Sequence, residues 1–194
     1  GSMGSGSSSA LTTALYVGSA ATSLDIRNNI FANTQTATST TQKNYAIYSV
    51  AANTSFSNIN NNIYFVSNSF NAGSAILGFI GTDRIDLTAL ATGFGGNSSS
   101  MNVNPQFVSS TDLHINSGTS QTVLESTGAN VGVNTDFDGQ TRPGPVGSTN
   151  GGGSAPDIGA DEFDGVPLPQ CTTPTVQASA VTITNLGATT STVS

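Results

Sequence analysis

Two stretches of the chain repeat each other at an offset of 33 residues. Leu24 to Asn33 (LDIRNNIFAN) aligns with Ser57 to Val66 (SNINNNIYFV), so that apolar, Asn-Asn and aromatic positions coincide. Each copy reads as a strand, an Asn-containing turn and a second strand. In stacked parallel strands, equivalent apolar side chains form a continuous core. An Asn at the bend then bonds the backbone and the Asn of the next layer. The alternative is two unrelated Asn-rich turns.

Short apolar clusters separated by Asn, Gly, Ser and Thr continue along the chain and favour strands over helices. Tyr45–Val50 and Ala75–Ile80 read as strands. The one helix candidate, Asp83–Ala91, spans about two turns at most and reads equally well as a loop with a strand. With the repeat, this pattern predicts a solenoid that carries an extra strand and a protruding loop in each turn.

Charged residues are scarce, and their balance excludes some classes of partner. Lys and Arg number four against eleven Asp and Glu, which gives a net charge of −7 and a pI near 4.1. Binding to nucleic acid or to an anionic membrane surface needs clustered basic residues, so neither is expected. We also expect no membrane insertion, because no apolar run reaches eighteen residues. The single cysteine, Cys171, can form no internal disulfide and lies beside no obvious base.

Four motifs in fixed order resemble the C-terminal end of right-handed parallel β-helix proteins of the pectate-lyase-like superfamily, which are common in secreted and cell-surface proteins of Bacteroidetes. They are Asn104-Pro-Gln-Phe-Val108, Asp112-Leu-His-Ile115, Asp136-Phe-Asp-Gly-Gln-Thr-Arg-Pro-Gly144 and Pro156-Asp-Ile-Gly-Ala-Asp-Glu-Phe163. The resemblance implies an all-β, right-handed parallel β-helix with a C-terminal closing segment. Ser120–Gly128 departs from the segment that family members often carry at this point.

The composition divides the chain into four parts. Residues 1–10 read as a tag or Gly/Ser-rich linker, and residues 11–165 as the β-helix coils with their closing motif. Residues 166–170 (VPLPQ) are a semi-rigid linker. Residues 171–194 resemble the first strands of a fibronectin type III module, and a stub of this length is too short to bury a core of its own.

The acidic residues near the end of residues 11–165 allow two interpretations. Asp136, Asp138, Asp157 and Asp161 can supply oxygen ligands for Ca²⁺, with carbonyl groups from the Gly-rich turns. Alternatively, Arg142 pairs with Glu162 or Asp161 as a structural clamp, for which a bidentate Arg–carboxylate pair is suited. The only histidine, His114, is expected to be structural and hydrogen-bonded beside Asp112. Zinc needs three or four ligands, and the sequence shows too few.

These features support two functional hypotheses. The first is a non-catalytic segment of a large secreted or cell-surface protein, acting as a stalk, an adhesive or a glycan-contacting surface. Tyr45, Tyr48, Tyr64 and Arg27 are its candidate glycan contacts, and an open end of the solenoid predicts a homodimer. The alternative is a fragment of a polysaccharide lyase or glycoside hydrolase. That enzyme needs two or more carboxylates converging with Arg27 or Lys43 in one cleft. The sequence names no ligand.

Overall fold

The chain is described from a computed structural model that covers residues 11–36, 41–67, 74–117, 123–144 and 155–165. The tag or linker, the 166–170 linker, Cys171 and the fibronectin-like stub lie outside these residues. The strands are β1 (Thr12–Val17), β2 (Leu24–Arg27), β3 (Ile30–Asn33), β4 (Asn44–Ser49), β5 (Phe56–Asn60), β6 (Ile63–Val66), β7 (Ala75–Ile80) and β8 (Thr82–Arg84), with a 3₁₀ turn η1 (Asn53–Ser55) and one helix, α1 (Leu87–Phe94).

The repeat identified in the sequence is present as two pairs of parallel strands. β2 lies beside β5 and β3 beside β6, in two separate two-stranded sheets. From Asp25 onward the register is the one that the alignment predicts: Ile26 lies opposite Ile59, Ile30 opposite Ile63 and Phe31 opposite Tyr64. Leu24 lies opposite Phe56, one residue away from the predicted partner, because the register shifts between Leu24 and Asp25. Equivalent side chains of the two copies therefore stack on each other, as the repeat predicted.

Asparagine side chains join the two copies at the bend. Asn28 and Asn61 take positive φ angles of 60° and 51°, a conformation that Asn tolerates better than most residues. One residue later, the Asn62 Oδ1 accepts hydrogen bonds from the backbone N–H and the side-chain amide of Asn29, at 3.0 and 3.1 Å. The Asn62 amide donates to the carbonyl of Ile26 at 2.9 Å. This fully buried amide satisfies polar groups that the bend would otherwise leave unpaired.

A third sheet has the strand order β1-β4-β7-β8, parallel except for the antiparallel pair β7–β8. Gly81, at φ 67°, makes the tight turn between β7 and β8. Helix α1 follows, with Asp86 accepting from the N–H of Ala89 as its N-cap and Gly95 ending it at φ 77°. The sequence predicted either a short helix or a loop with a strand for residues 83–91. The structure contains both the end of a strand and the start of a short helix in this segment.

The prediction of an all-β, right-handed parallel β-helix is wrong. The described residues form a small mixed α/β domain with short, mostly parallel strands in three small sheets, one helix and no closed or solenoid sheet. The parallel stacking is only two or three strands deep, and β8 then reverses direction against β7. Beyond residue 97 the described chain makes isolated bridges in place of strands. Extending a local repeat to the whole chain was the error.

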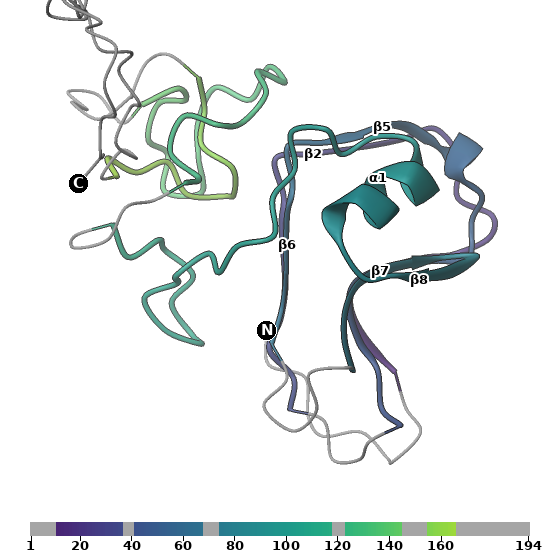
Figure 1. Cartoon of the computed structure of the whole chain (residues 1–194). Helices are drawn as coiled ribbons and strands as arrows, with labels where there is room; N and C mark the ends of the chain where they lie inside the picture. Colours follow the sequence, from purple (N-terminus) through teal and green to yellow (C-terminus); the bar gives the residue numbers. More distant parts are fainter. Residues whose placement is uncertain (1–10, 37–40, 68–73, 118–122, 145–154, 166–194) are drawn as a thin grey trace, which may run out of the picture.

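Two apolar clusters lie on opposite faces of the β3–β6 sheet. One includes Ile47, Tyr64, Leu90 and Phe94, and α1 covers it (Figure 1). The other contains Ile63, Ile115, Leu124, Ile158 and Phe163, contributed by β6 and by the later segments. Adjacent residues of β6, Ile63 and Tyr64, enter different clusters because successive side chains of a strand point to opposite faces. The second cluster anchors the described segments after residue 100 to the sheet.

Two further observations bear on the partners considered above. No helix in the described part of the chain is long and apolar enough to cross a membrane. Strand β1 lies at the edge of its sheet, where unpaired backbone groups can accept another strand. A homodimer through such an edge stays a prediction.

Candidate functional site

The acid-rich end of the described chain is held by carboxylates that accept backbone N–H groups. The Asp136 Oδ1 accepts from the N–H groups of Asp138 and Gln140 at 2.9 and 2.7 Å, which closes a tight turn. Its Oδ2 accepts from the N–H of Glu162 at 3.0 Å. Asp136 therefore ties this turn to the closing segment 155–165, and both of its oxygens already have partners.

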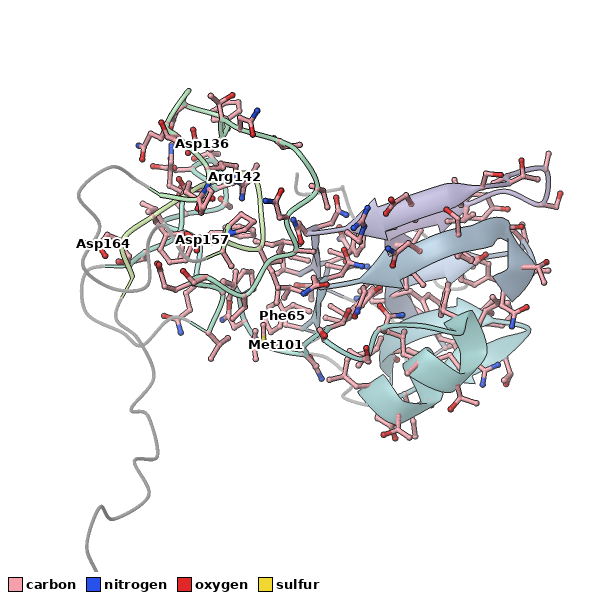
Figure 2. All side chains as sticks on the ribbon, turned by 90° about the horizontal axis from the view of Figure 1, so that it is seen from above. Phe65, Met101, Asp136, Arg142, Asp157 and Asp164 are labelled. Atoms are coloured by element: carbon pink, nitrogen blue, oxygen red, sulfur yellow. The ribbon has the colours of Figure 1, made fainter. Side chains whose placement is uncertain are left out.

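Arg142 lies at the centre of this region (Figure 2). Its Nε donates to the Glu162 Oε2 at 2.6 Å, and its Nη2 donates to the carbonyl groups of Asp157 and Gly159 at 2.8 and 3.0 Å. The other oxygen of Glu162 accepts from the N–H of Gly144 at 2.9 Å. The side chains of this pair are 9 % and 0 % exposed. The structure thus contains the Arg–carboxylate contact that defines the clamp interpretation.

Asp157 and Glu125 are buried carboxyl groups in the same region. The two oxygens of Asp157 accept from the N–H groups of Ser126 and Phe163, and Glu125 accepts from the N–H of Gly165. Burial raises the pKa of Asp157 to about 8, although both N–H groups oppose the shift. Burial likewise raises the pKa of Glu125. Both carboxyl groups therefore hydrogen-bond backbone N–H groups of this region.

The raised pKa of Asp157 predicts that this region loses stability as the pH rises. The folded-state pKa, about 8, exceeds the ordinary value of 3.8, so the fold favours the protonated carboxyl. Its contribution to stability is complete below pH 3.8 and is lost as the pH rises to about 8.

Glu125, whose pKa is also raised, acts in the same direction, and the charge of Glu162 adds to the shift of Asp157. We expect the melting temperature to fall between pH 4.5 and 8, with a shallower slope in Asp157→Asn. A melting temperature that rises over this range, or an unchanged slope in the variant, would contradict the assignment.

The four aspartates proposed as calcium ligands do not gather in one place. Asp136 and Asp157 bond backbone N–H groups as described above. Asp138 and Asp161 instead come together with His114, and one donor atom of each residue lies within 4.8 Å of the others. The His114 Nδ1 hydrogen-bonds the Asp112 carboxylate, and its Nε2 bonds the Asp138 Oδ2 at 2.7 Å. The contact between His114 and Asp112 was predicted from the sequence.

The three tyrosines proposed for glycan contact have little free ring surface. Tyr45 and Tyr64 are buried, and the Tyr64 hydroxyl donates to Asn97 inside the core. Tyr48 is stacked between the rings of Tyr16 and Phe79, with centroids 5.9 and 4.4 Å away, so both faces of its ring are covered. Stacking on a sugar needs an exposed aromatic face, and the faces of these rings are covered by other side chains of the protein.

The basic residues named for a catalytic cleft are also paired elsewhere. Arg27 forms a bidentate contact with Asp25 at 2.6 and 2.7 Å, and Lys43 pairs with Asp83. Both pairs lie at the surface. Neither residue lines any of the cavities described next.

Adjoining cavities follow the β3 strand on the side that faces residues 104–116. They have volumes of about 390 and 340 Å³, and share Ile30, Phe31, Phe107 and Leu113 as walls. A third, of about 520 Å³, shares Phe107 and Leu113 and adds polar residues of the loop such as Asn104 and Ser109. We call these three cavities together the β3 groove.

Polar groups surround the apolar walls of the β3 groove. Asn33, Thr34 and Gln35 lie along the first cavity, and Asn28, Asn29 and Asp161 along the second. The Oε1 atom of Gln35 is buried and has no hydrogen-bond partner. Sequence reasoning missed this groove because it forms between segments about 80 residues apart. Its one local signal is Leu113, an apolar residue that is 53 % exposed within the motif Asp112–Ile115.

Comparison with family models, curated proteins and solved structures finds no match for the chain.

Proposed function

We propose that this chain is a non-catalytic segment of a secreted or cell-surface protein, and that it binds a neutral glycan in the β3 groove. The observation that carries the proposal is a groove with aromatic and aliphatic walls, bordered by amides and hydroxyls, beside an amide oxygen without a partner. Sugar rings present apolar C–H faces and hydroxyl edges. Phe31, Phe107 and Leu113 suit the faces, and Thr34 and Gln35 suit the edges.

The Oε1 atom of Gln35, which has no hydrogen-bond partner, can accept a hydrogen bond from a ligand in the groove. An unsatisfied buried acceptor costs about 1–3 kcal/mol. A sugar hydroxyl can supply the missing donor once the amide rotates towards the cavity. A neutral glycan also suits the charge, because the protein has a net charge of −7 and Asp161 is the only ionisable residue among the groove walls.

The groove walls favour binding over hydrolysis. A glycoside hydrolase needs two carboxyl groups about 5–10 Å apart across the bond that it cleaves. Asp161 is the one carboxylate on these walls, and its Oδ2 already accepts from the N–H of Ile115 at 2.9 Å. The scattered, paired basic residues support the same choice. The enzyme hypothesis therefore has no observation in its favour among the described residues.

The proposal predicts measurable binding to neutral polysaccharides that depends on Leu113. Isothermal titration calorimetry with soluble xyloglucan, mannan and dextran tests it, with an acidic polysaccharide for comparison. We expect at least one neutral polymer to bind, and Leu113→Ala to weaken that binding about tenfold, which corresponds to about 1.4 kcal/mol.

Val133→Ala is the matched control, because Val133 is 54 % exposed and lies outside the groove. It should bind as the unmodified chain does. Failure of all three neutral polymers to bind overturns the proposed function. Equal affinities of the Leu113 and Val133 variants contradict the groove as the site of binding.

A further inference from the structure

Three side chains from three separate segments meet beside the β3 groove. His114 comes from the loop 104–116, Asp138 from the turn after Asp136, and Asp161 from the closing segment. One donor atom of each lies within 4.8 Å of the other two. This is the only such group of three or more His, Cys, Asp or Glu residues in the described part of the chain.

A fourth residue, outside this group, fixes the direction of the imidazole. Asp112 hydrogen-bonds the Nδ1 of His114, which leaves Nε2 pointing towards Asp138. Histidines that bind a metal commonly give their other ring N–H to a carboxylate, which sets the tautomer and the ring orientation. In the proposed site, Asp112 therefore fixes the imidazole with its Nε2 towards Asp138.

Negative groups outnumber positive groups in the cluster. Three carboxylates, those of Asp112, Asp138 and Asp161, surround a single imidazole. Every Lys and Arg of the chain is engaged elsewhere: Arg27 with Asp25, Lys43 with Asp83, Arg84 with the Ile80 carbonyl and Arg142 with Glu162. A divalent cation in the centre brings the local charge closer to balance than one imidazolium does.

We propose that the His114 Nε2, the Asp138 carboxylate and the Asp161 carboxylate bind a divalent transition metal of the Zn²⁺ type, with Asp112 as a positioning residue. The metal takes the place of the proton on Nε2. One nitrogen and two carboxylate oxygens suit zinc, at about 2.0–2.2 Å, with water in the fourth position. Asp161 keeps one oxygen for the Ile115 N–H and offers the other. The ion joins three segments of the chain and requires no glycan.

Titration of the full chain with ZnCl₂ and with CoCl₂ tests the site. We expect one equivalent of Zn²⁺ to bind and to raise the melting temperature, with EDTA reversing the rise, because a ligand of the folded state stabilises it. His114→Gln should abolish the binding. Asp112→Asn should retain one equivalent but weaken it about 10–100-fold, the usual effect of losing such a positioning carboxylate. Asp25→Asn, which removes an acidic residue paired elsewhere, should change nothing.

Proton NMR of the Co²⁺-loaded chain gives a readout that does not depend on variants. Because His114 is the only histidine, its coordination should produce one strongly shifted, exchangeable imidazole N–H signal. Absence of that signal, or no zinc binding at stoichiometric concentrations, overturns the proposal. So does a stabilisation by Ca²⁺ that survives His114→Gln, which would assign the aspartates to calcium instead.

Discussion

Replacing Arg142 with methionine is expected to lower the free energy of unfolding of the segments 134–144 and 155–165 by about 3–5 kcal/mol, the typical cost of removing one partner of a buried ion pair. Methionine keeps much of the apolar volume but leaves the Glu162 carboxylate, fully buried, without its cation. It also removes the two donors that bind the carbonyl groups of Asp157 and Gly159. Urea denaturation followed by circular dichroism measures the loss. Hydrogen exchange at the Glu162 and Phe163 amides locates it.

Two further variants separate the buried pair from a general effect of losing an arginine. Arg27→Met removes the pair with Asp25 at the surface, and such pairs contribute about 0–1 kcal/mol. The double variant Arg142→Met/Glu162→Gln removes the uncompensated charge while keeping an acceptor for the Gly144 N–H. We expect it to be more stable than Arg142→Met alone. Equal losses in the Arg142 and Arg27 variants would sink the clamp interpretation.

The parts of the fold that the sequence predicted are those encoded by local repetition. The offset of 33 residues gave the pairing of β2 with β5 and of β3 with β6, since residues at equivalent positions stack directly. The Asn-Asn pairs predicted the bend, because Asn tolerates a positive φ angle and its side chain can hydrogen-bond the Asn of the adjacent copy. The Arg142–Glu162 contact was foreseeable because charges are scarce, which leaves an arginine few partners.

The errors have a common physical origin, which is packing between distant segments. The repeat fixes two layers, but nothing in it states that β8 turns back on β7 or that α1 covers the core. Gly81 and the Asp86 N-cap are local signals for both events, and they were insufficient to exclude a further strand. The burial of the aromatic residues could not be predicted for the same reason: ring burial in Tyr45 and Tyr64 depends on what faces them across the sheet.

The candidate sites depend even more on distant contacts. The β3 groove needs Phe31 and Phe107, and the proposed metal site needs His114, Asp138 and Asp161, each brought together from separate segments. Zinc was set aside at the sequence level because one histidine supplies too few ligands. The fold adds two carboxylates that lie 24 and 47 positions further along the chain. A motif with regular spacing in the sequence cannot predict such a group, because the three residues lie in different segments that only the fold brings together.

Asn62→Leu is expected to lower the free energy of unfolding by about 3 kcal/mol or more. Leucine has a similar size and fits a buried position, so the expected loss comes from hydrogen bonds rather than from a cavity. The backbone N–H of Asn29 loses its acceptor and the carbonyl of Ile26 loses the Asn62 donor, and a buried group left unsatisfied costs about 1–3 kcal/mol. Thermal and urea unfolding measure the effect, with Asn102→Leu as the control at an exposed position, where substitutions change stability by about 0.5 kcal/mol or less. If the two variants lose equal stability, apolar stacking alone holds the repeated strands in register. A selective loss at Asn62 means that the polar bend, conserved in form between the two copies, is itself what fixes one layer on the next.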